Sequence, residues 1–144
     1  MNSLTKYDLM YMKTALLQAE LSNGIRAKVG AVLVTKSGVV LTGYNGTHAG
    51  ADNSLEYIDT DTGELITKPD VIHAELNCLL KAAKEGVSCI GSTLYVTLSP
   101  CSHCAALMIQ SGIKKVFFKD QYRDSRGCDT LQSFGIEVNQ LSLE

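Results

Sequence analysis

The fold is decided by the stretch at residues 93–104, TLYVTLSPCSHC. Residues 93–98 form an apolar run that is typical of a buried strand, and the residues after Pro100 are typical of a helix that Gly112 ends. Two thiols, Cys101 and Cys104, therefore lie three positions apart in the first turn of a helix. The positive end of a helix favours thiolates, which bind zinc or take part in redox reactions.

Strand-like and helix-like segments alternate on both sides of this stretch. We expect a helix at 3–22, strands at 29–34 and 39–43, a helix at 73–84, a strand at 92–97, helices at 100–111 and 130–134, and strands at 115–118 and 136–138. The first two strands are joined by a short turn and should be antiparallel, whereas the later alternation implies parallel strands. The sequence thus predicts an α/β fold with a mixed sheet. It also predicts a long loop at 47–70, and loops of this length in small domains usually have a function.

Two of the expected helices have an apolar face that should pack on the sheet. In the first helix this face comprises Leu4, Tyr7, Met10, Tyr11, Leu17 and Leu21. In the helix at 73–84 it comprises Leu76, Leu79, Leu80 and Ala83.

Length and composition fit a single globular domain that spans residues 1–144. The net charge of −2 gives no general attraction to nucleic acid, and no apolar run is long enough to cross a membrane. Residues 1–6 lack the order of a signal peptide, and five cysteines are an odd number. We therefore expect a cytoplasmic protein with reduced thiols, without nucleic-acid or membrane partners.

A second motif, His73-Ala74-Glu75, precedes the cysteines and opens the expected helix at 73–84. Residues two apart do not share a helix face, so His73 and Glu75 can reach one centre only at the very start of the helix. A catalytic zinc site would use three ligands, His73, Cys101 and Cys104, and keep a position open for water. This interpretation gives a role to His73 and both cysteines as ligands, and to Glu75 as the base that takes a proton from the water.

Two other interpretations of the thiols remain open. A structural zinc site would need a fourth ligand such as Cys78 or Cys128, and it leaves Glu75 without a role. A redox Cys-x-x-Cys motif leaves both His73 and Glu75 without one. His103, between the two cysteines, should point away from the face that they share.

The combination of His-x-Glu with Pro-Cys-x-x-Cys is the signature of zinc-dependent nucleobase deaminases. In that chemistry Glu75 is the general acid–base: it takes a proton from water and passes protons to N3 and to the leaving ammonia. Two thiolates offset the charge of Zn²⁺, so a separate base is needed. A carboxylate that both accepts and donates protons should be enclosed, with a raised pKa.

With the further segment Gly43-Tyr44-Asn45-Gly46, the chain resembles the deoxycytidylate deaminases of the cytidine deaminase superfamily over residues 5–138. The resemblance implies a three-layer αβα fold with a five-stranded mixed sheet, and hydrolysis of dCMP to dUMP and ammonia. It also implies one catalytic Zn²⁺ per chain and a homo-hexamer. Regulation by dCTP and dTTP, with Mg²⁺ accompanying the regulatory nucleotide, is a property of some members.

The resemblance also implies how the nucleotide is held. Asn45 would bond the sugar or nucleotide, the amide of Ala74 and the carbonyl of Ser99 would bond the base edge, and Tyr122 would pack on the nucleotide. We assign the 5′-phosphate to Arg26, with Arg123 as the second choice, because a planar guanidinium can bond two oxygens. The alternatives are solvated surface charges for the arginines and ordinary packing for Tyr122.

The chain departs from the family pattern at His48, where proline is common, and it lacks cysteines between Gly46 and His73 that give some members a second zinc. Three other functions are compatible with the zinc motifs: deamination of dCTP or another cytosine nucleotide, deamination of tRNA adenosine, and a binding module with structural zinc. An RNA enzyme would need a basic track, for which the net charge of −2 offers little. A structural module would be indifferent to the loss of Glu75.

Overall fold

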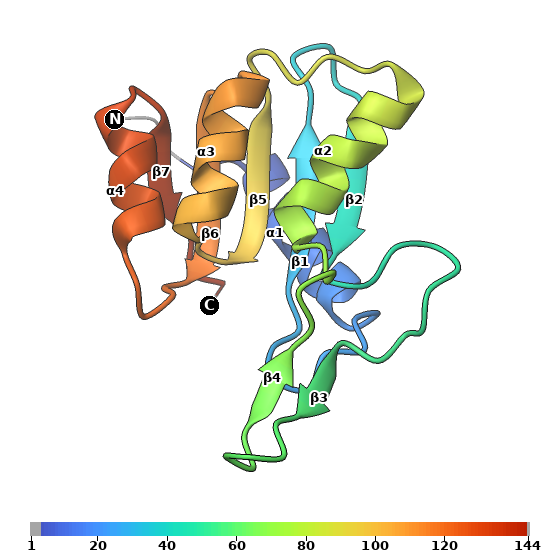
Figure 1. The fold of residues 1–144 in the computed structure, drawn as a ribbon. Helices are drawn as coiled ribbons and strands as arrows, with labels where there is room; N and C mark the ends of the chain where they lie inside the picture. The colour runs from blue at the N-terminus through green and yellow to red at the C-terminus, as the bar shows by residue number, and fades with distance from the viewer. Residues whose placement is uncertain (1–3, 144) are drawn as a thin grey trace.

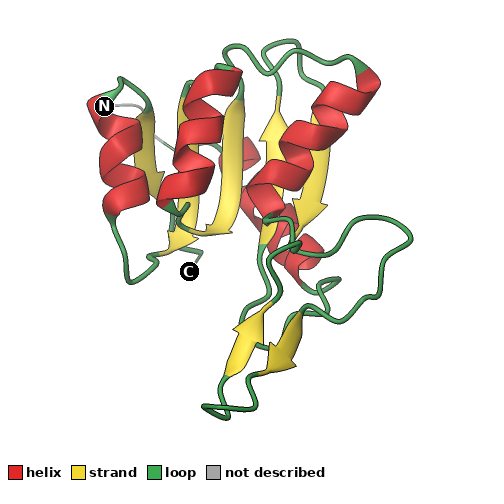
Figure 2. Ribbon diagram, viewed as in Figure 1, coloured by secondary structure: helices red, strands yellow, loops and turns green. Residues whose placement is uncertain are grey.

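A five-stranded mixed sheet forms the centre of the computed structural model, which describes residues 4–143 (Figures 1 and 2). The strand order is β2-β1-β5-β6-β7, with bounds Gly30–Val34 (β1), Val40–Tyr44 (β2), Thr93–Leu98 (β5), Lys115–Asp120 (β6) and Glu137–Gln140 (β7). Strand β1 is antiparallel to both β2 and β5, whereas β5, β6 and β7 are parallel. The expected mixed sheet and its antiparallel first pair are confirmed.

The helices form a layer on each side of this sheet (Figure 1). One face carries α1 (Lys6–Ala19), and the other carries α2 (Ala74–Glu85), α3 (Ser102–Ser111) and α4 (Arg126–Ser133). Helices α2 and α3 both end at a glycine in the left-handed region, Gly86 at φ 68° and Gly112 at φ 90°, as the sequence predicts. The three-layer αβα arrangement is therefore confirmed.

The predicted packing face of α1 is wrong for five of its six residues, whereas Tyr11 is partly buried and packs against Tyr95 in the core. Leu4 and, within the helix, Tyr7, Met10 and Leu17 are exposed, as is Leu21 just beyond it, and the expected start at Ser3 lies outside the described residues. The helix instead buries Met12, Ala15 and Ala19. The reason is close approach: a Cβ on Gly30 of β1 would lie 1.9 Å from the carbonyl oxygen of Ala15. Only small side chains fit between backbones that lie so near each other.

The same close approach decides which face of α2 is buried. A Cβ on Gly43 of β2 would lie 2.7 Å from the carbonyl oxygen of Ala74. The buried residues of α2 are accordingly Ala74, Glu75, Cys78 and Ala82. Of the face predicted from bulky residues, Leu80 and Ala83 are exposed, and Leu76 and Leu79 are only partly buried. This packing turns Glu75 inward.

The segment expected to be an unstructured loop contains a β-hairpin. Strands β3 (Glu56–Ile58) and β4 (Leu65–Thr67) pair antiparallel and project beyond the main sheet (Figure 1). The ends of this segment are joined by two backbone hydrogen bonds between Gly46 and Ile72, of 3.0 and 2.8 Å. The strands have only three residues each and show no alternation of buried and exposed positions, so no strand period was visible.

Helix α4 begins at Arg126, four residues before the predicted start at Thr130. Gly127 lowers the helix propensity of this first turn, which hid it in the sequence. The glycine is needed because a Cβ there would lie 2.0 Å from the carbonyl oxygen of Pro100. Within residues 4–143, no helix is long and apolar enough to cross a membrane.

Candidate active site

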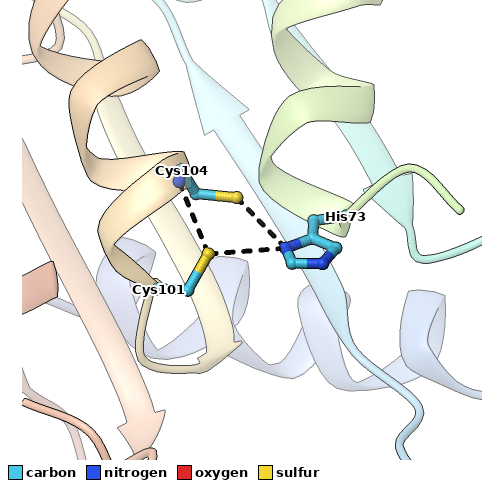
Figure 3. Close-up of side chains that lie close together, drawn as sticks. All are labelled: His73, Cys101 and Cys104. Atoms are coloured by element: carbon cyan, nitrogen blue, oxygen red, sulfur yellow. Dashed lines mark hydrogen bonds between the residues drawn. The ribbon is translucent and has the colours of Figure 1, made fainter. Parts of the chain in front are cut away.

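His73, Cys101 and Cys104 meet where α2 and α3 begin (Figure 3). His73 is the N-cap residue of α2 and Cys101 is the N-cap residue of α3, with Cys104 in the first turn of α3. The Nδ1 atom of His73 lies 3.2 Å from the sulfur of Cys104 and 3.7 Å from that of Cys101. The sequence prediction that His73 sits at the very start of its helix is confirmed.

These three side chains fit a zinc ion. Bonds of about 2.3 Å to sulfur and 2.0 Å to nitrogen at a tetrahedral angle place ligand nitrogen and sulfur atoms about 3.5 Å apart. The three ligand atoms lie within 4.8 Å of one another. Among residues 4–143, this is the group of three His, Cys, Asp or Glu side chains whose ligand atoms lie close enough to hold a metal ion. Cys78, Cys128 and His103 lie outside the group. Within the described residues, therefore, no further cysteine supplies the fourth ligand that a structural zinc site would need.

The three ligand side chains share their protons through hydrogen bonds. Hydrogen bonds from Cys104 and His73 lower the pKa of Cys101 to about 3, although burial opposes this shift. The Cys104 thiol donates to Cys101, which raises its own pKa, and the bond to Cys101 raises the pKa of His73. Cys101 is thus the thiolate of the set, and its sulfur also accepts the amide of Cys104 at 3.4 Å.

Glu75 lies in the first turn of α2 with only 4% of its surface exposed. Burial raises the pKa of its carboxyl to about 7, and the neighbouring His73 opposes this shift. The carboxyl is also within hydrogen-bonding reach of the Cys104 thiol. A carboxyl that titrates near neutral pH can both accept and donate a proton there, as a general acid–base requires.

Beside this group lies a cavity of about 520 Å³. It is lined by nine of the ten sequence-predicted site residues: Arg26, Asn45, His73, Ala74, Glu75, Ser99, Cys101, Tyr122 and Arg123. Cys104, the tenth, is buried next to it. Ser99 and Tyr122 follow the carboxyl ends of the parallel strands β5 and β6, the usual place for ligands in such sheets.

Two of the predicted substrate contacts also hold the cavity wall together. The Asn45 side chain accepts the amide of Val29 at 2.8 Å and donates to the carbonyl of Ala27 at 3.0 Å. The Ser99 hydroxyl accepts the amide of Tyr122 at 2.6 Å and the side-chain amide of Gln121 at 3.1 Å. The Arg123 guanidinium lies 5.9 Å from the centre of the Tyr122 ring. These bonds fix two loops at the mouth of the cavity.

Sequence reasoning missed the part of the cavity that the hairpin supplies. Leu55, Glu56, Thr67 and Val71 line the cavity from this segment. Glu56 is only 8% exposed, and its carboxylate accepts the amides of Ile25 and Arg26. A single acidic residue in a polar stretch gives no sequence signal for such a role. Only the fold brings residue 56 next to residue 26.

Comparisons with known proteins agree with this site. The family "Cytidine and deoxycytidylate deaminase zinc-binding region" matches residues 5–120. The deoxycytidylate deaminase of Enterobacteria phage T4 is 34% identical over 88% of this chain and 86% of its own length. The mouse enzyme of the same name is 42% identical over 80% of this chain and 66% of its own length.

A solved structure extends the agreement to the whole fold. The dCMP deaminase of cyanophage S-TIM5, in complex with dCMP and dUMP, is 40% identical with a TM-score of 0.85, and the match covers 97% of this chain and 100% of that one. The expected cytidine deaminase-like fold is confirmed, as is the expected resemblance. The chain therefore belongs to the cytidine and deoxycytidylate deaminase zinc-binding family, as a deaminase of its deoxycytidylate deaminase branch.

Proposed function

We propose that this protein hydrolyses dCMP to dUMP and ammonia, with residues 1–144 acting as one catalytic domain. The observation that carries the proposal is the buried Glu75 beside the ligand group, at the wall of a cavity of nucleotide size. The complex of a 40% identical relative with dCMP and dUMP supports the choice of substrate.

His73, Cys101 and Cys104 would hold the zinc. The bound ion supplies an acidified water and a centre of positive charge. Glu75 accepts a proton from water as the water oxygen adds to C4 of the cytosine ring. It donates this proton to N3. It then takes the proton of the new C4 hydroxyl and donates it to the amino group, which leaves as ammonia when the C4–N bond breaks and the C4 carbonyl forms. Its pKa of about 7 allows both directions of transfer at neutral pH.

Other cavity residues would orient the nucleotide. The first-turn amide of Ala74 has no helical partner, so it can donate to the base, and the carbonyl of Ser99 can accept from the amino group. Asn45 retains one amide hydrogen and one lone pair for the sugar after its two backbone bonds. Tyr122 would pack on the nucleotide, and Arg26 would bond the 5′-phosphate.

Replacing Arg26 with alanine is expected to raise the KM for dCMP about 30-fold, because the loss of one partner of a charged pair costs roughly 2 kcal/mol. The measurement is release of ammonia with dCMP, dCTP, CMP, deoxycytidine and an adenosine-containing tRNA loop as substrates. Selectivity for dCMP over deoxycytidine should fall, because deoxycytidine has no phosphate. Lys28→Ala is the matched control, since Lys28 is exposed on the same loop and does not line the cavity.

Three outcomes of this panel would overturn the proposal in whole or in part. Failure of the wild-type protein to deaminate any cytosine nucleotide would refute the proposed function. An unchanged KM in Arg26→Ala with a raised KM in Arg123→Ala would move the phosphate to Arg123, which also lines the cavity. Faster turnover of dCTP or of the tRNA loop would identify one of those alternatives as the substrate.

Regulation and assembly extend the proposal. We include activation by dCTP and inhibition by dTTP, which the same panel measures when each nucleotide is added to dCMP. In the described part of the chain, no group of protein side chains apart from the zinc ligands could hold the Mg²⁺ expected with a regulatory nucleotide. A cytoplasmic location suits thiol ligands, which a reducing compartment preserves.

We also propose a homo-hexamer, which the exposed apolar side chains of α1 support. Tyr7, Met10 and Leu17 expose 57%, 47% and 64% of their surfaces, and such patches often mark contact surfaces between proteins. Native mass measurement should give six chains. Replacing Leu17 with lysine should lower that mass, whereas a wild-type monomer would refute the assembly.

A further inference from the structure

The loop that carries Arg26 has no regular structure of its own. It runs from the end of α1 to the start of β1, and residues 25–28 are exposed. An arginine on such a loop would lose much of its conformational freedom on binding phosphate, and this loss would weaken binding. Something outside the loop must therefore fix the position of Arg26.

Glu56 at the start of β3 holds the backbone of this loop. One oxygen of its carboxylate, Oε2, accepts the amide of Ile25 at 2.8 Å and that of Arg26 at 3.0 Å. Both bonds have a charged acceptor, which makes them stronger than bonds between neutral groups. Glu56 is 8% exposed and lines the same cavity as Arg26.

The hairpin also holds the other end of Arg26. The guanidinium Nη1 donates to the hydroxyl of Thr67 in β4 at 3.3 Å. The backbone of Arg26 is thus bound by β3 and its side chain by β4. The two strands are themselves paired, with Glu56 directly opposite Thr67 in the register. The paired residues Glu56 and Thr67 therefore fix the positions of both the backbone and the guanidinium of Arg26.

We propose that Glu56 is a positioning residue for the 5′-phosphate subsite, acting through Arg26. The inference rests on the proposed function, because it takes dCMP as the substrate and Arg26 as the phosphate ligand. The hairpin then contributes to substrate selection by fixing a cation, without supplying one.

The test is a double-mutant cycle between Glu56 and Arg26 in the zinc-loaded enzyme. Glu56→Ala should raise the KM for dCMP about tenfold with kcat within about twofold, since it removes both amide bonds. Glu56→Gln, whose side-chain carbonyl can still accept an amide, should recover part of this loss. Glu64→Gln is the matched control, because Glu64 is an exposed carboxylate in the same segment.

In the Arg26→Ala background, Glu56→Ala should change the KM by less than about twofold, because positioning a missing arginine has no effect. The full tenfold factor in that background would overturn the inference, as Glu56 would then act independently of Arg26. A fall in kcat equal to the rise in KM, with a lowered melting temperature for Glu56→Gln, would indicate a purely structural role and also overturn it. Absence of any cytosine nucleotide turnover in the wild-type protein would instead refute the proposed function.

Discussion

Replacing Glu75 with glutamine is expected to lower kcat for dCMP about 10³-fold. Glutamine has nearly the same shape, but it cannot take a proton from water or return one to the leaving amino group. The burial that raises the pKa of Glu75 to about 7 should accept a neutral amide readily. Zinc content and melting temperature should therefore stay close to those of the wild-type protein.

Steady-state kinetics with dCMP, together with zinc analysis of the same sample, measure this effect. Glu85→Gln is the matched control, because Glu85 is an exposed carboxylate at the other end of α2. Wild-type kcat in zinc-loaded Glu75→Gln would rule out the acid–base role. Loss of zinc from this variant would show instead that Glu75 supports the ligands.

Replacing Cys104 with alanine is expected to reduce bound zinc to below about a tenth of an ion per chain, and activity should fall in parallel. Two ligands remain, His73 and Cys101, and two protein ligands hold zinc far more weakly than three. Cys104 is 1% exposed, so the change also removes a buried sulfur from the start of α3.

Metal analysis after dialysis, paired with dCMP turnover, checks this expectation. Cys89→Ala is the control, because Cys89 is partly buried and lies outside the ligand group. Removal of zinc from the wild-type protein by a chelator should reproduce the loss of activity, and added Zn²⁺ should restore it. Full activity of the metal-free protein would contradict the zinc site.

The zinc ligands and Glu75 could be predicted from the sequence because they depend on short-range geometry. A helix start fixes the directions of residues 73 and 75, and the same holds for residues 101 and 104. Each motif also follows a segment whose end is visible in the sequence: the loop at 47–70 before His73, and the apolar run at 93–98 before Cys101. The folded chain needed only to bring two helix starts together: α2 packs on β1 and β2, and α3 follows β5, the strand next to β1.

The packing faces of α1 and α2 could not be predicted in the same way. Hydropathy gives weight to bulky residues such as Leu17 and Leu80, whereas the sheet selects small ones such as Ala15 and Cys78. The selection comes from glycines in the strands, whose effect appears only when two backbones approach each other. Glu56 escaped notice for a related reason, since its partners lie 30 and 31 residues away in the sequence.

The paired backbone bonds between Gly46 and Ile72 have a consequence for how such a protein can change over time. Residues 47–71 leave the main body and return to it at one closed point, where Asn45 precedes Gly46 and His73 follows Ile72. The free energy of closing such a segment grows only slowly with its length. Insertions there can therefore reshape the entrance for new substrates while the reacting centre keeps its spacing.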